Sequence, residues 1–341
     1  MKEQRVLVTG ASGFVGSHAV IQLLEEGYQV RGTVRAPERS GDLLEFFRQR
    51  ASDPSQVELV KGDLSSDEGW KEAAEGCAYV LHIASPIPLQ VPKDRDGLVK
   101  PARDGALRVL KAAQAAGCKR VVMTSSIAAI GYGKDKTQTR PYTEEDWTDP
   151  DSPELNSYLR SKTLAEMAAW DFVNAAGDGL ELTVINPGLI LGPALMQDIG
   201  TSAEAVKQLM TGQIPMYPRL GYAVVDVRDV ARSHILAMTN PEAAGQRIIC
   251  AGEFCWFEDI GAFLREAYPE RRVPTRRMPN WLVRLIAMFN QGLRSNIEDL
   301  DRTQRVSNDK MQRILGLKPR GAKEATLATA ESLIKLGVVP K

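Results

Sequence analysis

A tyrosine and a lysine four residues apart, Tyr158 and Lys162, are the pair in this sequence best suited to acid–base chemistry. On a helix, residues at this spacing share one face, so the phenol and the ammonium group would lie close together. A nearby cation stabilises phenolate, and we expect Lys162 to lower the pKa of Tyr158 from about 10 toward neutral. Tyr158 could then donate or accept a proton. An ordinary surface pair is the alternative, which the spacing alone does not exclude.

Two serines, Ser125 and Ser126, follow the apolar segment 121–124. A hydroxyl at the carboxyl end of a sheet strand lies where ligands bind in open α/β folds. It could hydrogen-bond a substrate oxygen and stabilise developing negative charge. The sequence by itself does not show which of Ser125 and Ser126 would bind the substrate oxygen. A strand-end turn or a helix cap would also explain both serines.

A glycine-rich segment stands between the first apolar run and the first helical pattern. Residues without Cβ let the backbone approach a phosphate, and the helix N-terminus offers free N–H groups and a positive dipole end. The spacing is G-x-x-G-x-x-G rather than G-x-G-x-x-G, but the strand–turn–helix context favours a dinucleotide site over plain turn glycines. The predicted cofactor loop comprises Gly10, Ser12, Gly13, Phe14, Val15 and Gly16.

Arg35 stands at the end of the second expected strand, where an NAD-selective site usually carries Asp or Glu. A guanidinium suits a 2′-phosphate through charge-assisted hydrogen bonds, so we predict NADP as the cofactor rather than NAD. A solvated surface arginine is the alternative. Asp63, followed by Leu64, comes shortly after the third expected strand. Its carboxylate could accept a hydrogen bond from the adenine amino group or cap the next helix.

The elements that must position these residues alternate between short apolar strands and helical patterns. This rhythm indicates βαβ units and a parallel sheet covered on both faces, whose strands read as near-continuous hydrophobic runs. We expect strands at residues 5–9, 28–34, 57–60, 79–83, 121–124 and 182–185, and helices at residues 14–26, 42–50, 67–75, 97–116 and 155–176.

After Pro187 the rhythm loosens. The fold class predicted is α/β, a Rossmann-type doubly wound parallel sheet with a smaller, mostly helical C-terminal substrate lobe. We place an NADP-binding domain at 1–187, joined by a later strand that returns near 223–252, and a substrate-binding lobe at 188–341. We expect strands at 223–227 and 247–251, the latter beside 182–185, and helices at 202–211, 230–239, 257–268, 281–289, 308–315 and 323–336.

Charge and hydropathy argue against several partners. The 43 Lys and Arg residues balance 43 Asp and Glu residues, so we expect no nucleic acid and no membrane partner. The segment 281–289 contains Arg284 and is far shorter than the ~20 apolar residues that span a bilayer, so we interpret it as a core or interfacial helix. The basic run 271–277 lacks interleaved aromatic residues and is interpreted as a solvated face. No signal-peptide pattern precedes the first strand, and we expect a cytoplasmic location.

Cysteine and histidine usage suggests no metal chemistry. The four cysteines are expected to be reduced and mostly buried, and the three histidines to be structural, because no cluster has metal-ligand spacing. We therefore predict no metal. The absence of a G-x-S-x-G elbow argues against a serine hydrolase.

The order of these motifs resembles the extended short-chain dehydrogenase/reductase family, within the NAD-dependent epimerase/dehydratase superfamily. The branch to which the chain is most similar contains dihydroflavonol reductases, cinnamoyl-CoA reductases and yeast-type aldehyde/ketone reductases. The matching segments span roughly residues 5 to 240 and are 8–16, 33–35, 82–86, 124–126, 158–166, 186–188 and 225–231.

The resemblance implies roles for individual residues. Ser126 would be the catalytic serine, Tyr158 the acid/base, and Lys162 its partner, which also holds the nicotinamide ribose. The remaining implied cofactor contacts are Ile83, Ala84 and Ser85 along the cofactor, Pro187 and Gly188 near the nicotinamide, and Ser202 at a phosphate. A homodimer through paired helices is a further implication of the resemblance.

The leading functional hypothesis is an NADP(H)-dependent oxidoreductase that reduces a small aldehyde or ketone, or oxidises the alcohol. Apolar residues after Gly188 favour a hydrophobic or aromatic substrate. The segment 156–159 departs from the Asn-Trp-Tyr-Cys motif of plant cinnamoyl-CoA reductases, which argues against a CoA thioester. Ile130 and Gly131 stand near the position of a substrate-contacting asparagine in flavonoid reductases, which argues against a dihydroflavonol.

Three alternatives use the same fold. A nucleotide-sugar epimerase or dehydratase is disfavoured because Ile127, Ala128 and Ala129 stand where a dehydratase needs carboxylates, and Arg35 argues against tightly bound NAD. A hydroxysteroid dehydrogenase is a nearer variant. A non-catalytic NADP-sensing protein is the third, but such proteins commonly lose the Tyr–Lys pair that this chain keeps.

Overall fold

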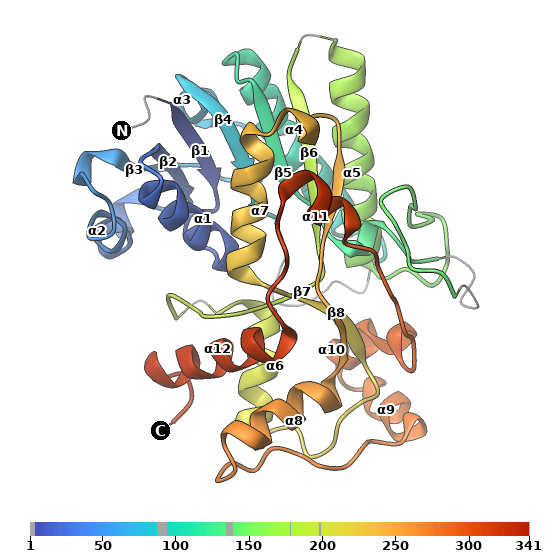
Figure 1. The fold of residues 1–341 in the computed structure, drawn as a ribbon. Coiled ribbons are helices and arrows are strands. Elements are labelled where there is room, and N and C mark those ends of the chain that lie inside the picture. The colour runs from blue at the N-terminus through green and yellow to red at the C-terminus, as the bar shows by residue number, and fades with distance from the viewer. Residues whose placement is uncertain (1–3, 87–93, 134–138, 178, 198, 341) are drawn as a thin grey trace.

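Seven parallel strands form the main sheet, in the order β3-β2-β1-β4-β5-β6-β9 (Figure 1). The computed structural model describes residues 4–86, 94–133, 139–177, 179–197 and 199–340. The strand order reverses between β1 and β4, which is the position where such sheets bind ligands. The strands are β1 (Arg5–Thr9), β2 (Gln29–Val34), β3 (Val57–Lys61), β4 (Cys77–His82), β5 (Arg120–Thr124), β6 (Glu181–Pro187) and β9 (Arg247–Cys250).

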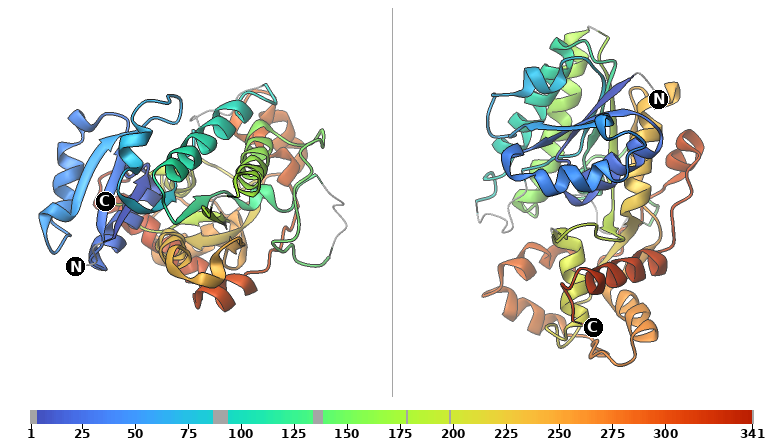
Figure 2. Two further views of the ribbon diagram at one scale, coloured as in Figure 1. Left: turned by 90° about the horizontal axis from the view of Figure 1, so that it is seen from above. Right: turned by 90° about the vertical axis from the view of Figure 1, so that its left-hand side faces the viewer.

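Helices cover both faces of this sheet, as the view from above shows (Figure 2). Side chains of β1 alternate between two cores: Val6 and Val8 pack with α1 and α7, whereas Leu7 packs with α3 and α4. The covering helices are α1 (Phe14–Glu25), α7 (Val227–Thr239) and α2 (Gly41–Arg48), with α11 (Asp309–Leu315) beside β9, and α3 (Trp70–Ala74), α4 (Val99–Ala115) and α5 (Ser157–Ala176) on the other face.

A smaller lobe follows β6 in the chain and lies below the sheet in Figure 1. Its own three-stranded sheet has the order β10-β8-β7, and its helices share a separate apolar core. The elements are β7 (Leu189–Leu191), β8 (Gly221–Asp226), β10 (Phe254–Trp256), α6 (Gly200–Met210), α8 (Phe257–Ala267), α9 (Asn280–Ala287), α10 (Gln291–Ser295) and α12 (Ala322–Lys335). Short 3-10 turns are η1 (Pro37–Arg39), η2 (Pro54–Gln56), η3 (Ile127–Ala129), η4 (Pro241–Ala243) and η5 (Ile297–Asp299).

The predicted fold class is confirmed, with local corrections. The later strand expected to return to the main sheet does so as β9, which pairs with β6 at Ile185 and Ile248. The strand predicted at 223–227 is β8, which belongs to the second sheet instead. The helix predicted at 67–75 is only α3, because Gly69 before it adopts a positive φ of 84°. The three-residue strands β7 and β10 were not predicted, since so short a run carries no periodicity.

All four cysteines are buried and free, as predicted. Within the described ranges, no helix is both long and apolar enough to cross a bilayer.

Candidate active site

Most of the candidate residues lie at the carboxyl edge of the main sheet, because they directly follow its parallel strands, and Tyr158 of α5 reaches the same edge beside Ser126. The first is the glycine loop after β1. Gly10 has a φ of +69°, which favours glycine, and its amide donates to Thr33 Oγ1 at 3.2 Å. A Cβ at Gly16 would lie 2.1 Å from the Gly10 carbonyl oxygen, so α1 can start this close to the loop only with glycine there.

The start of α1 is open to an anion. The first intrahelical hydrogen bond runs from the Ser17 amide to the Gly13 carbonyl, so the amides of Phe14, Val15 and Gly16 have no partner within the helix. No side chain in the described part of the chain caps this end, and Ser12 is exposed beside it. The free amides and the positive end of the helix dipole together can hold a phosphate group.

The segment after β4 lies against this loop. A Cβ at Gly10 would lie 3.1 Å from Ala84 Cβ, and the Ala84 amide donates to Thr9 Oγ1 at 3.0 Å. Thr9 Oγ1 also lies 3.0 Å from His82 Nδ1, and burial lowers the pKa of His82 to about 3. A neutral His82 therefore fixes the strand end, and the partly buried Ile83–Ser85 segment continues from it alongside the glycines.

Arg35 and Asp63 lie at the ends of neighbouring strands. Arg35 is exposed immediately after β2. Asp63 Oδ1 accepts hydrogen bonds from the Ser65 amide at 2.8 Å and the Ser65 hydroxyl at 2.7 Å. These bonds lower the pKa of Asp63, and the charge of Arg35 adds to the effect. The Asp63 carboxylate thus stabilises the turn that holds Leu64, whereas Arg35 is exposed to solvent.

Tyr158 and Ser126 face one another across the sheet edge. The Tyr158 hydroxyl lies 3.5 Å from Ser126 Oγ, at the long end of hydrogen-bond distance. Ser126 Oγ accepts from the Ala128 amide at 3.1 Å, which fixes its side chain at the start of η3. Asn156 caps α5 by accepting from the Leu159 amide, and so sets the position of Tyr158 in the first turn.

Lys162 lies one turn further along α5 and is only 8 % exposed. Burial lowers the pKa of Lys162 to about 8, although the charge of Glu166 partly offsets this. Burial also raises the pKa of Tyr158, opposite to the direction expected from the sequence, because the desolvation of the phenol outweighs the hydrogen bond to Ser126. The structure describes no acceptor for the Lys162 ammonium within the protein, so its three N–H groups are available to a ligand.

A buried polar network underlies the pair. Glu166 Oε2 accepts from Ser125 Oγ at 2.5 Å and from Asn186 Nδ2 at 2.8 Å, and Arg247 Nε lies 2.5 Å from Glu166 Oε1. Asn186 Nδ2 also donates to the Ser126 carbonyl at 3.1 Å. The structure therefore separates the two serines: Ser125 is bound to Glu166, and Ser126 faces Tyr158.

Two further predicted contacts have clear positions. Gly188 follows β6, donates to the Cys250 carbonyl at 3.1 Å, and lies so near β8 that a Cβ would be 2.1 Å from the Ala223 carbonyl oxygen. Pro187 precedes it at the end of β6. Ser202 lies in the first turn of α6, and Phe14 of the glycine loop packs into the same apolar cluster as α6. The start of α6 therefore lies near the start of α1.

Glu166 and Arg247 were not predicted as site residues. Glu166 could have been found from its spacing, since Tyr158, Lys162 and Glu166 repeat every four residues and share one face of α5. Arg247 gave no local signal, because its contact with Glu166 joins residues 81 positions apart.

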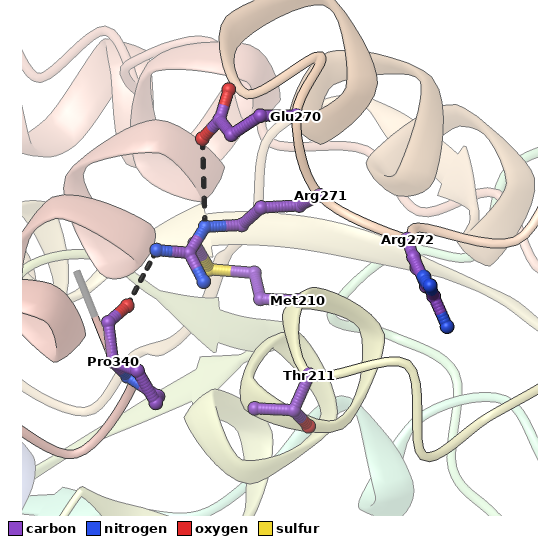
Figure 3. Close-up of a pocket in the computed structure, with 6 residues that line it drawn as sticks. All are labelled: Met210, Thr211, Glu270, Arg271, Arg272 and Pro340. Carbon is purple, nitrogen blue, oxygen red and sulfur yellow. Dashed lines mark hydrogen bonds and ion pairs between the residues drawn. The ribbon is translucent and has the colours of Figure 1, made fainter.

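A surface hollow of about 370 Å³ lies elsewhere, in the smaller lobe (Figure 3). Its lining includes Met210, Glu270, Arg271 and Pro340, none of them a candidate site residue. Arg271 lies 3.8 Å from Glu270 and donates to the Pro340 carbonyl at 2.5 Å, so its charge is used within the protein. No group of three or more metal-ligating side chains occurs among the described residues.

Comparisons with known proteins agree with this arrangement. The NAD dependent epimerase/dehydratase family matches residues 6–252. Cinnamoyl-CoA reductase 1 of Petunia hybrida is 38 % identical over 277 residues, which cover 80 % of each chain. Dihydroflavonol 4-reductase of Zea mays is 35 % identical over 278 residues, covering 80 % of this chain and 76 % of that one. The structure of yeast methylglyoxal/isovaleraldehyde reductase Gre2 with NADPH superposes with a TM-score of 0.81 at 28 % identity, over 98 % of this chain and 99 % of that one.

A doubly wound sheet with a phosphate loop, and a tyrosine, a serine and a buried lysine at its carboxyl edge, define a dinucleotide-dependent enzyme. The chain belongs to the NAD dependent epimerase/dehydratase family. The relatives named above are reductases of carbonyl compounds.

Proposed function

We propose that this protein is an NADP(H)-dependent carbonyl reductase that uses Tyr158 as the proton donor. The observation that carries the proposal is the approach of the Tyr158 hydroxyl to Ser126 Oγ. One helical turn away lies the buried ammonium of Lys162, for which the described residues supply no acceptor. Only β4 separates β5, which leads into Ser126, from β1 and its glycine loop, so a dinucleotide bound with its pyrophosphate at the loop could extend its reactive ring toward Tyr158.

The residues present fit NADP. The open start of α1 suits the pyrophosphate, and Ser202 at the start of α6 suits a phosphate from the opposite side. Arg35, exposed after β2, suits the 2′-phosphate and is the reason for preferring NADP over NAD. Lys162 would hold the nicotinamide ribose. We propose that Asp63 and Leu64, Ile83 to Ser85, and Pro187 and Gly188 line the same cofactor groove.

Each catalytic side chain has a distinct task in reduction. The cofactor, when bound, supplies the hydride. Ser126 Oγ donates a hydrogen bond to the carbonyl oxygen, and Tyr158 transfers its proton to that oxygen as negative charge develops. The charge of Lys162 then stabilises the phenolate left on Tyr158. In alcohol oxidation the same groups act in reverse, with Tyr158 accepting the proton.

The substrate that we propose is a small hydrophobic or aromatic aldehyde or ketone. Its pocket would lie between Ser126 and the smaller lobe, in agreement with a cofactor domain at 1–187 and a substrate lobe at 188–341. Ser157 and Leu159 differ from the motif of plant cinnamoyl-CoA reductases, so a free carbonyl compound is favoured over a CoA thioester. We also propose a cytoplasmic homodimer, on the resemblance to the family, with no nucleic acid partner.

The experiment is to measure NADPH oxidation with a panel of aldehydes, ketones and aromatic carbonyl compounds. Tyr158→Phe is the test variant, and NADH is the alternative cofactor. We expect turnover with NADPH that falls below detection in Tyr158→Phe, while NADPH still binds. Absence of turnover across the panel, with cofactor binding intact, would favour an epimerase, a dehydratase or a cofactor sensor instead. Turnover that survives in Tyr158→Phe would exclude the proposed proton donor.

A further inference from the structure

The exposed large apolar side chains of the described chain all lie in one nine-residue segment. They are Trp281 (68 % exposed), Leu285 (48 %), Met288 (61 %) and Phe289 (86 %). Positions 281, 285 and 288 follow the helical repeat, so α9 and the two residues that follow it present a continuous apolar face to solvent. We name these four side chains the α9 apolar face. Such a concentrated patch on a protein surface indicates an interaction site.

The opposite side of α9 is anchored in the lobe. Val283 and Ala287 are each 1 % exposed, so the helix is held by one face, and none of the described residues covers its apolar outer face. Asn280 at the start of α9 donates to Asp301, and Arg294 donates to the Ala287 carbonyl at 3.0 Å at its end. The outward orientation of the apolar face is therefore fixed at both ends of the helix.

Arginines predominate in the segment that carries this face. Residues 271–297 contain six arginines and no Asp or Glu. Arg276 precedes α9, Arg284 stands within it and Arg294 follows it, and all three are exposed. Among the described residues, Arg276 and Arg284 form no ion pair, whereas Arg277 is paired with Asp301 at 2.6 Å. The net charge of zero for the whole chain conceals this local concentration.

We propose that the α9 apolar face and its arginines dock this protein on an anionic lipid surface. Trp, Phe, Leu and Met would enter the boundary between headgroups and acyl chains, while arginines around them contact lipid phosphates. A second copy of the chain fits less well, because pairing two such faces would bring their arginines together. The contact is peripheral, so it agrees with the absence of a spanning helix in the described ranges.

The location of α9 suits such a contact. The helix lies at the end of the smaller lobe that is remote from the main sheet (Figure 1). Docking there leaves the cofactor edge of the sheet free. A reductase held in this way would act next to a store of hydrophobic carbonyl compounds, a consequence that depends on the proposed function, whereas the docking itself does not.

The test is co-sedimentation of the full chain with vesicles of phosphatidylcholine alone and of phosphatidylcholine mixed with phosphatidylglycerol. We expect binding to the anionic vesicles that weakens at high NaCl and is small with phosphatidylcholine alone. Phe289→Ser should lower the partition coefficient roughly tenfold. Arg284→Glu should lower it at least fivefold, since each basic residue near an anionic surface contributes roughly a fivefold factor.

Arg313→Glu, an exposed arginine on α11 with the same change of charge, is the matched control and should bind vesicles as the unchanged protein does. Thermal unfolding and NADPH binding should be unaltered in all three variants, which shows that they fold. Failure to bind either vesicle would overturn the proposal, as would binding insensitive to Phe289→Ser. A dimer in sedimentation velocity that Phe289→Ser dissociates, with no vesicle binding, would assign the face to a second copy instead.

Discussion

Lys162 and Glu166 lie one turn apart on α5. Because of this spacing, the charge on Lys162 depends on the same buried carboxylate that holds the polar network below it. Glu166 is fully buried and raises the pKa of Lys162 against the larger effect of burial. Its carboxylate also holds Ser125 and Asn186, and Asn186 binds the carbonyl of Ser126. One side chain thus influences both the charge on Lys162 and the position of Ser126, the proposed catalytic serine. Glu166 is therefore a positioning residue.

The pH dependence of reduction should report this link. Reduction requires a charged Lys162, so kcat/KM should fall as pH rises through about 8, the pKa of Lys162. In Glu166→Gln the negative charge that raises this pKa is lost, so the fall should move to lower pH. The maximal kcat/KM should also drop roughly tenfold to a hundredfold, the loss expected when a catalytic group is displaced.

Glu181→Gln is the matched control, because Glu181 pairs with Arg120 at 2.6 Å and is not among the charges that shift the pKa of Lys162. It should leave the pH profile in place even if it lowers stability. An unshifted profile in Glu166→Gln would mean that Glu166 acts on structure alone.

At the scale of elements, the sequence predicted the main sheet and several residues that lie at its carboxyl edge. Strands of the main sheet are continuous apolar runs, and their carboxyl ends are marked by Gly10, Arg35 and Ser126, so both the fold class and the common location of these residues followed from local patterns. The direction in which the pKa of Tyr158 shifts could not be predicted from local patterns, because it depends on burial by side chains from several elements. The contact between Glu166 of α5 and Arg247 of β9 was not predicted either, because it joins elements that are distant in sequence.

The junction between β1 and α1 depends on Gly16. A Cβ there would lie 2.1 Å from the Gly10 carbonyl oxygen, so Gly16→Ala must push the helix start away from the loop. Overpacking of this kind costs about 1–3 kcal/mol. We expect a lower Tm and a NADPH affinity reduced at least tenfold in Gly16→Ala, measured by thermal unfolding and by nicotinamide fluorescence on titration.

Gly41→Ala is the control, because a Cβ at Gly41 meets nothing within 4 Å at the start of α2. It should bind NADPH normally. Normal binding by Gly16→Ala as well would show that the helix start can shift without disturbing the phosphate loop.

At the scale of the whole molecule, Arg247 joins parts of the chain that are distant in sequence. It stands on β9, the strand that returns from the smaller lobe's portion of the chain, and donates to the carbonyls of Glu144 and Asp146, each at 2.8 Å. Its guanidinium lies 3.5 Å from the ring centre of Trp147 and pairs with Glu166. The strand β9, the loop before α5 and the helix α5 are thus held by one buried cation.

Replacing Arg247 should show how strongly its charge and that of Glu166 are coupled in the stability of the fold. Arg247→Met leaves the Glu166 carboxylate buried without its counter-ion, and breaking a buried pair in this way costs about 3–5 kcal/mol. Glu166→Gln removes the charge that needs compensation, so the double variant Arg247→Met/Glu166→Gln should be less destabilised than the sum of the single variants. The difference should be about 1–3 kcal/mol, as for residues in direct contact. Urea unfolding of the four proteins measures it, and strict additivity would mean that Arg247 stabilises β9 through the backbone carbonyls and Trp147 rather than through Glu166.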